Sequence, residues 1–169
     1  MNRAPVACAA VGIFVVTLVL TACGGGADSS KPSAASSCAS QVAAWEGSGV
    51  RADLGNLPSQ LTKTSSDVQQ EGAGSLTGSA DTSAAKSDLG TLQKEYKLLT
   101  AHQPPSCVRN LRSDYATFLR FDNYVVNQEL PAFIKNPGDV VDGNLAWGHA
   151  TYAAGLLPQV QKDLKGYSS

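Results

Sequence analysis

The sequence predicts an all-α fold: an antiparallel helical bundle of about four helices with one disulfide, preceded by a signal peptide and a flexible tether. Beyond residue 37, apolar side chains recur every three or four positions through most of the chain, which is the spacing of amphipathic helices. No segment alternates convincingly between apolar and polar residues, so no β-strand is expected. About 130 residues are enough for one domain with a core of its own.

The first 22 residues have the layout of a signal peptide. A short start carrying Arg3 is followed by an apolar run over residues 6–20, and small residues come after it. A single membrane span needs about 20 apolar residues with polar flanks on both sides, and this run is shorter. We therefore expect residues 1–22 to be cleaved off, with an uncleaved anchor as the alternative.

The segment Leu20-Thr21-Ala22-Cys23 resembles the lipobox of bacterial lipoproteins, in which a leucine stands three positions before a cysteine and small residues lie between them. The resemblance implies that Cys23 is alkylated on sulfur by a diacylglycerol and becomes the N-terminus of the mature chain. Acyl chains contribute about 0.8 kcal/mol per buried methylene group, so several chains hold a protein stably on a bilayer. The expected location is the extracytoplasmic face of the cell membrane. An ordinary secretion signal with a chance cysteine is the competing interpretation.

Residues 23–37 are predicted to be the lipidated cysteine and its flexible tether. Three glycines are followed by small and polar residues in no pattern, which is the composition of a flexible linker. The tether would hold a domain over residues 38–169 near the bilayer without requiring that the domain touch it.

Charge and cysteine content limit the classes of partner and site. The formal net charge is −1 and no cluster of Lys and Arg is present, so nucleic acid is not an expected partner. Cys38 and Cys107 most simply form one disulfide in an exported protein. Two free thiols or half of a metal site is the weaker interpretation, because there is no CxxC pair and His102 has no companion ligands. We expect no metal and no cofactor.

The first half of the domain is predicted to hold a short helical turn over residues 38–45 and two helices. Residues 50–68 have helical spacing around Pro58, so the first helix is either kinked there or begins near Leu57. The glycine-rich residues 71–80 are predicted to be a loop. A second helix is expected from residue 81 or 82, either of which can cap it, to near His102.

The second half is predicted to hold two long helices. The third opens at residue 105 or 106 and carries one apolar stripe for about seven turns, with a bend or stop near Pro131. Asn136 and Pro137 predict the cap and the start of the fourth helix, which should run towards Pro158. Its inward face is expected to consist of Val141, Leu145, Gly148, Tyr152 and Gly155 or Leu156.

The domain also resembles small helical secreted proteins and lipoproteins of actinobacteria. The shared features are a cysteine near the mature start, Trp45 followed by Gly47 and Gly49, a glycine-rich middle loop, and a proline-containing turn into a tyrosine-bearing helix. The resemblance covers most of the mature chain and implies a helical fold at the cell envelope. It carries no catalytic residue.

Candidate functional residues are few, and no catalytic motif is present. There is no Gly-x-Ser-x-Gly elbow, and the glycine clusters lack the strand and helix that a phosphate loop requires. His149 is the histidine to consider for a catalytic or metal role. Asp122 falls near the apolar stripe of the third helix, where a buried carboxylate would need an arginine or tyrosine partner. A solvent-facing Asp122, or one held by a structural hydrogen bond, is the simpler interpretation, and a ligand-binding polar group in the interior of the bundle is the alternative.

Aromatic residues gather in the second half, and those that fall off the predicted stripes point to a partly exposed binding patch. The possible ligand or partner surface is therefore predicted to contain Asp122, Phe121, Tyr124, Trp147 and His149.

The function that this pattern favours is a non-enzymatic, lipid-anchored envelope protein that acts by binding a protein or a small ligand. One alternative is a carrier of an apolar ligand or lipid with a cavity inside the bundle. The other is an enzyme of unrecognised type, with His149 or Asp122 in a cleft beside a second polar group.

Overall fold

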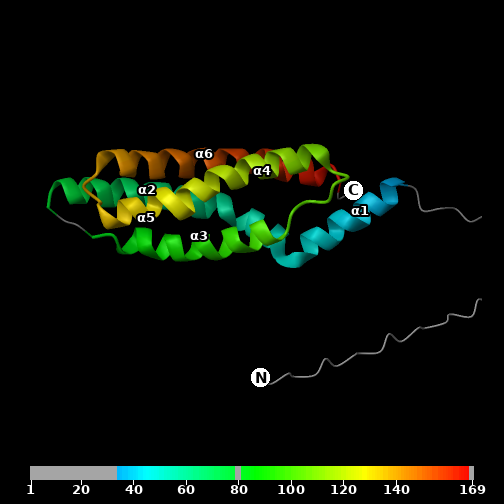
Figure 1. The fold of residues 1–169 in the computed structure, drawn as a ribbon, viewed down its shortest axis with the longest axis horizontal. Helices are drawn as coiled ribbons and strands as arrows, with labels where there is room; N and C mark the ends of the chain where they lie inside the picture. The colour runs from blue at the N-terminus through cyan, green and yellow to red at the C-terminus, as the bar shows by residue number, and fades with distance from the viewer. Residues whose placement is uncertain (1–33, 79–80, 168–169) are drawn as a thin grey trace, which may run out of the picture. The chain divides into compact units, whose positions relative to one another are not determined.

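Four helical rods lie side by side and alternate in direction (Figure 1). The structure, a computed structural model, describes residues 34–78 and 81–167. The rods are α2 (Arg51–Leu76), α3 (Ser83–Ala101), α4 (Arg109–Tyr124) continued by η2 (Val125–Glu129) and α5 (Leu130–Lys135), and α6 (Val140–Lys165). A shorter helix, α1 (Ala34–Trp45), precedes them and joins α2 through η1 (Glu46–Val50). No strand occurs within the described ranges, and the predicted all-α antiparallel bundle is confirmed.

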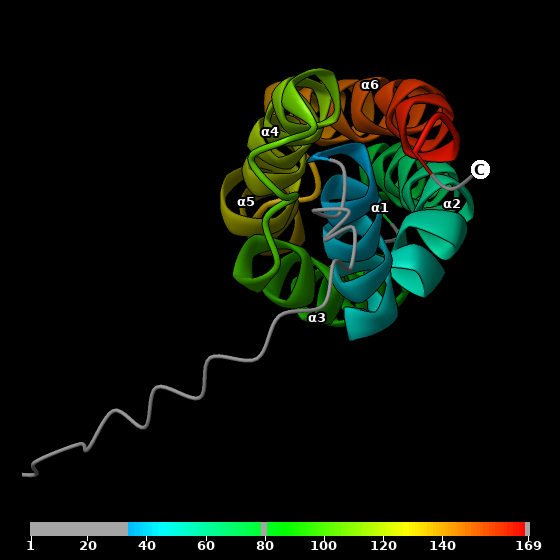
Figure 2. The same ribbon diagram turned by 90° about the vertical axis from the view of Figure 1, so that its right-hand side faces the viewer.

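Helix α1 lies over one end of the bundle, between the surrounding rods (Figure 2). Its Val42 and Trp45 are buried there, and the Trp45 indole Nε1–H donates a hydrogen bond of 2.7 Å to the backbone oxygen of His102. Gly49 has a φ of 98°, a left-handed conformation that favours glycine, and it turns the chain from α1 into α2. The Gly-x-Gly after Trp45 is thus a corner between two helices.

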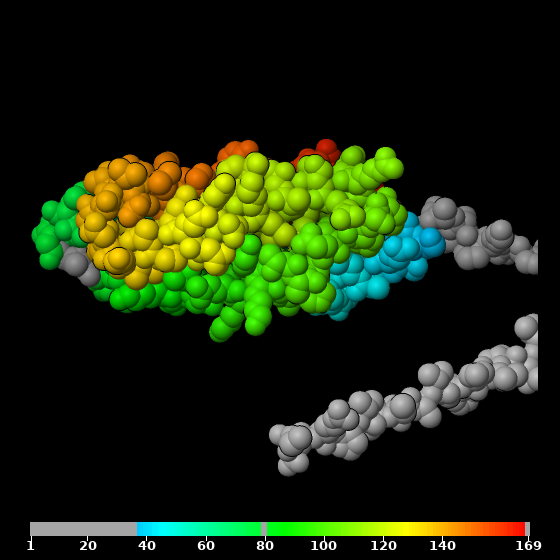
Figure 3. Space-filling model, viewed as in Figure 1, coloured from blue at the N-terminus to red at the C-terminus, as the bar shows by residue number. Residues whose placement is uncertain are grey.

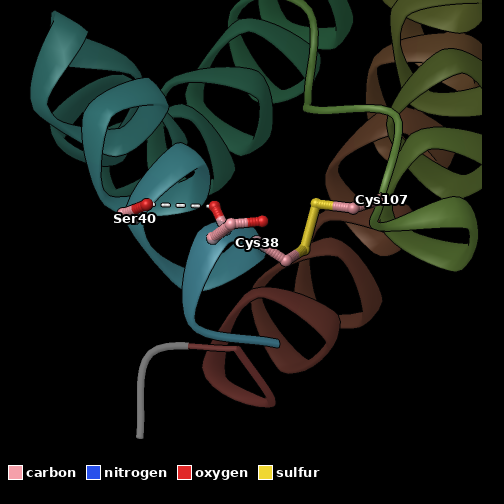
Figure 4. Close-up of a disulfide and its surroundings, with 4 residues drawn as sticks. Cys38, Ser40 and Cys107 are labelled. Atoms are coloured by element: carbon pink, nitrogen blue, oxygen red, sulfur yellow. Dashed lines mark hydrogen bonds between the residues drawn. A yellow bond between two sulfur atoms is a disulfide. The ribbon is translucent and has the colours of Figure 1, made fainter. Parts of the chain in front are cut away.

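A disulfide between Cys38 and Cys107 ties α1 to the connection just before α4 (Figure 4). The two cysteines are 69 positions apart in the sequence, and the pairing predicted from cysteine number is confirmed. Two residues further on, the Ser40 hydroxyl donates to the backbone oxygen of Ser37 at 3.0 Å. As expected for alternating helices, the two joined segments meet at the same end of the bundle.

Helix α2 passes through Pro58 without ending there, because α6 replaces the backbone hydrogen bond that proline cannot make. Pro58 has no N–H to donate to the carbonyl of Leu54, four residues earlier. The side-chain amide of Gln161 donates to that carbonyl oxygen at 2.8 Å. The two alternatives left open at Pro58 are resolved: the helix begins at Arg51.

Replacing Gln161 by Met should lower the free energy of unfolding by about 1–2 kcal/mol, since it leaves a buried carbonyl without a partner. In a Pro58→Ala background the restored N–H supplies that partner, and the same replacement should cost less than half as much. Chemical denaturation of the four proteins of this double-mutant cycle measures the difference. Equal costs in both backgrounds would contradict the assignment.

The glycine-rich residues after Val68 are helical up to Leu76, so the predicted loop over residues 71–80 is wrong for most of its length. The Glu71 carboxylate accepts hydrogen bonds from the backbone N–H groups of Ala84 and Ala85, at 2.8 and 3.2 Å, and so caps α3 from the neighbouring helix. Gly72 faces the ring of Phe133, with 3.6 Å between an added Cβ and the ring. Gly72 thus serves helix packing, a role that composition does not distinguish from a turn, whereas Gly78, with a φ of 94°, lies in the turn after α2.

Replacing Glu71 by Ala should destabilise the start of α3, at a cost of about 1 kcal/mol, which is typical for loss of a helix cap. Amide hydrogen exchange should speed up first at Ala84 and Ala85. Glu71→Gln keeps one acceptor oxygen and should retain part of the protection; a uniform change along all the helices would argue against the cap.

The third rod matches its predicted stripe closely. It continues past Tyr124 through the wider turn of η2 and then as α5, with Pro131 in the first turn of that last helix. All the apolar positions predicted for this stripe are buried: Val108, Leu111, Tyr115, Phe118, Leu119, Val125, Val126, Leu130 and Phe133.

Helix α6 begins later and faces inward differently from the prediction. Its N-cap is Asp139, whose carboxylate accepts from the N–H groups of Val141 and Asp142 at 2.9 and 3.3 Å; Asn136 instead follows the last residue of α5. The inner face is built from small residues followed by larger ones: Ala146, Ala150, Ala153, Leu157, Val160 and Leu164. The predicted inward set is wrong, because Val141, Leu145 and Tyr152 are exposed.

The predicted signal peptide, residues 1–22, and the lipidated Cys23 lie outside the described residues, as does most of the predicted tether. The end of that tether is helical, because α1 begins at Ala34 rather than at Cys38. Among the described residues, no helix has both the length and the apolar character that crossing a membrane requires.

Candidate functional site

The first half of α6 presents large apolar side chains to solvent. Within the described ranges, five of the six exposed large hydrophobic residues lie on this half-helix, and the sixth, Leu76, ends α2. Val141 is 65% exposed to solvent, although apolar residues of a long amphipathic helix are normally buried. We call this set the α6 apolar face: Val140, Val141, Leu145, Trp147 and Tyr152.

A groove of about 280 Å³ runs along one flank of this face, where the end of α2, α5 and the start of α6 meet. Its apolar walls come from Val68 and Leu76 of α2, Phe133 of α5, and Val140 and Trp147 of α6. The start of α6 lies next to α5 at the end of the bundle away from α1 (Figure 3). The groove is therefore at the opposite end from the point where the chain enters the bundle.

Rings and a histidine pack together where α6 meets α4 and η2. The His149 Nδ1 lies 2.6 Å from the Glu129 Oε1, and the ring of Tyr124 stacks on the imidazole with 5.5 Å between centroids. Phe121 lies 4.5 Å from the ring of Tyr152, centroid to centroid. We call these five residues the aromatic-histidine cluster. It lies on the α4 side of α6, while the groove lies on the α2 side.

The structure brings together three of the residues predicted for a binding surface and separates the other two from them. Phe121, Tyr124 and His149 belong to the aromatic-histidine cluster, whereas Trp147 lines the groove on the other flank of α6. Asp122 is not on the surface, because its side chain is completely buried between the helices. The single aromatic patch predicted from the sequence is therefore divided between two sides of α6: the aromatic-histidine cluster on the α4 side and Trp147 in the groove on the α2 side.

Asp122 is a buried carboxyl group whose two oxygens both lack a hydrogen-bond partner among the described atoms. The prediction of a solvent-facing or hydrogen-bonded Asp122 is wrong, and no arginine or tyrosine bonds to this carboxyl within the described ranges. Burial, and then the like charge of Glu95 on α3, raise the pKa of Asp122 to about 7. Burial, with Asp53 of α2 as the lesser cause, also raises the pKa of Glu95 to about 7. Three helices thus bring acidic groups near one another around the buried Asp122, which favours the neutral forms of Asp122 and Glu95.

The bundle should become less stable as the pH rises. The folded pKa of Asp122 lies above its unfolded value of about 3.9, so the stabilisation from the neutral form is complete below about pH 4 and is lost as the pH rises through about 7. Between about pH 4 and pH 8, ionisation of Asp122 should lower the free energy of unfolding by an amount on the order of 2–4 kcal/mol. We expect the Asp122→Asn variant, whose side chain stays neutral, not to show this decrease.

Urea denaturation at several pH values measures this slope. Asp139→Asn, a neutralised carboxyl at the end of the bundle that keeps its capping ability, is the control and should leave most of the slope in place. Parallel profiles for the wild type and Asp122→Asn would contradict a buried, neutral carboxyl at low pH.

The chemistry that these positions support is binding. The contact with Glu129 holds the His149 ring in place at the edge of α6. His149 is not among the residues that line the groove. Within the described part of the chain, no group of three or more His, Cys, Asp or Glu side chains could hold a metal ion. His102 ends α3, with its ring Nδ1 2.9 Å from the Leu98 oxygen.

Two parts of the site were missed from the sequence: the groove, and Glu129 as the partner of His149. The signal for the groove was present as Ala146, Ala150 and Ala153, which recur at helical spacing and mark a close-packed inner face. With that face assigned, the larger apolar residues of the same half-helix must point outward. Glu129 gave no local signal, because η2 and α6 meet only in the folded chain.

Comparison with models of known families, with curated proteins and with solved structures gave no match to this chain.

Proposed function

We propose that this chain is a lipid-anchored protein of the bacterial cell envelope that acts by binding, and that its binding surface is the α6 apolar face with the adjoining groove. The observation that carries the proposal is the exposure of five large apolar side chains on one half-helix beside a groove. Such patches on small proteins mark interaction sites more often than isolated exposed residues do. The lipobox-like segment ending at Cys23 supports the anchor.

The position of the groove agrees with this arrangement. The chain enters the bundle at α1, at the opposite end from the groove (Figure 1). A domain held through its N-terminal side would leave the α6 apolar face free for a partner. The disulfide between Cys38 and Cys107 also suits a protein that works outside the cytoplasm.

The carrier hypothesis would need the apolar space to lie inside the bundle. The groove that the structure describes instead opens at the surface between α2, α5 and α6, which favours docking over enclosure. The enzyme hypothesis has the pair His149 and Glu129 as its best support, and a substrate cleft beside that pair would be its requirement.

The first test is the intact mass of the protein purified from the membranes of its own host. We expect a chain that begins at Cys23 and carries acyl mass, with Cys38 and Cys107 alkylated only after reduction. Cys23→Ser should abolish the acyl mass and release the protein from membranes or leave it unprocessed. A wild-type species that keeps residues 1–22 would overturn the anchor, and free thiols at both cysteines would overturn the exported state.

A further inference from the structure

We propose that the α6 apolar face and its groove dock an amphipathic helix of another protein, one with apolar side chains along its centre and basic side chains at its edges. This inference rests on the proposed function for the orientation of the domain. The shape of the surface, its charge and the reach of the anchor each bear on what occupies it.

The shape suits a helix better than a small molecule. Pockets for small ligands typically enclose about 300–1,000 Å³ and bury most of the ligand, whereas this groove holds about 280 Å³ and opens to solvent. Val141, Leu145 and Tyr152 extend the exposed apolar surface beyond the groove. From Val140 to Tyr152 the α6 apolar face spans about 18 Å along the helix. A docked helix places anchors at positions i, i+3 or i+4, and i+7, about 10 Å from first to last. The groove can hold the anchor side chains of the docked helix, while the rest of the α6 apolar face contacts the sides of that helix.

The charge around the groove is acidic. The segments that contribute its walls, residues 67–78 and 133–147, carry four acidic side chains and one basic one, Lys135. Asp67 is paired with Lys63 at 2.6 Å, and Glu71 is used as a helix cap.

Asp139 and Asp142 supply the negative charge nearest the groove, and Asp139 keeps its charge while it caps α6 through bonds from two backbone N–H groups. Asp139 lines the groove itself, and Asp142 lies in the first turn of α6. The helix dipole places a positive charge of about half a unit at the N-terminus of α6, which is smaller than the negative charge of two carboxylates. The net charge at this end of α6 is therefore negative. A partner with basic edges is complementary to this surface.

The protein's own lipid does not suit the groove. The ten residues between Cys23 and α1, if they behave as the flexible linker that their composition predicts, would span roughly 17 Å. Helix α2, which separates the α1 end from the groove, has 26 residues and is about 39 Å long. This comparison of lengths disfavours the chain's own acyl group as the occupant of the groove.

A second copy of the chain also fits poorly. Two copies anchored side by side on one membrane point the same way, which brings Asp139 and Asp142 of one copy near the same residues of the other. Like charges across an interface oppose association. A basic helix meets no such repulsion.

The test uses the acylated chain in nanodiscs of neutral lipid, with empty nanodiscs as the blank. The probe is a fluorescein-labelled helix of 18 residues made of Leu and Lys, with leucines at i, i+3, i+4 and i+7. Its partner probe has Glu in place of Lys. Fluorescence anisotropy gives the affinity, and a photoreactive group on the probe, read by mass spectrometry, gives the site of contact.

We expect the Lys probe to bind above the blank, with crosslinks on residues 140–152 and on the end of α2. Trp147→Ser together with Leu145→Ser should weaken binding about tenfold or more, since both side chains are exposed and their loss leaves the core intact. Asp139→Asn and Asp142→Asn should each weaken it about two- to fivefold at low salt, and less at high salt. Asp114→Asn, on α4, makes the same change in net charge elsewhere and should have no effect.

Each other outcome overturns the proposal in a distinguishable way. Equal affinity for the Glu probe and the Lys probe would contradict the claim that the partner helix has basic edges. Concentration-dependent dimers that crosslink through residues 140–152 assign the face to a second copy. Saturable binding of palmitate that Trp147→Ser abolishes assigns the groove to an acyl chain, and in that case the proposed binding function stands while the partner class fails. If neither helical probe, a second copy nor palmitate binds at the α6 apolar face, both the proposed binding function and the proposed partner class are wrong.

Discussion

Close packing of α6 through alanines is the constraint on which the rest of this structure depends. Ala146, Ala150 and Ala153 let the first half of α6 approach α2 and α4, where larger side chains would hold the helices apart. The larger apolar residues of that half-helix then have no room inside and face solvent. One choice of small residues thus sets both the tight interior and the exposed apolar surface, and the second half of α6 returns to ordinary packing with Leu157 and Val160.

Much of the fold follows from the sequence because the strongest signals are local. The third rod shows this best, since every predicted apolar position from Val108 to Phe133 is buried. The disulfide followed from cysteine number and from the alternating direction of the helices. These inferences hold because an amphipathic stripe of seven turns has one plausible way to bury itself, and two cysteines have one way to pair.

The errors arise where a residue has a partner far away in the sequence. Glu71 and Gly72 look like loop residues because composition does not show the N-terminus of α3 or the ring of Phe133. The helix through Pro58 needs Gln161, a residue of another rod. The site was likewise predicted only in part. Phe121, Tyr124 and His149 meet as expected, whereas Trp147 lies on the other flank of α6. Asp122 is interior because the apolar residues that precede and follow it in the stripe of its helix are buried. The cost of burying an unpaired carboxyl predicted a solvent-facing or bonded Asp122, and the structure buries it nonetheless.

The disulfide has a mechanical consequence. Any tension on the N-terminal side of the domain enters through the first turns of α1, only four residues before Cys38. The covalent bond passes that load directly to the segment before α4, so α1 and the third rod share it. Val42 and Trp45 are the buried hydrophobic side chains of this 12-residue helix. The cross-link adds a covalent attachment to their packing, so α1 does not peel away alone.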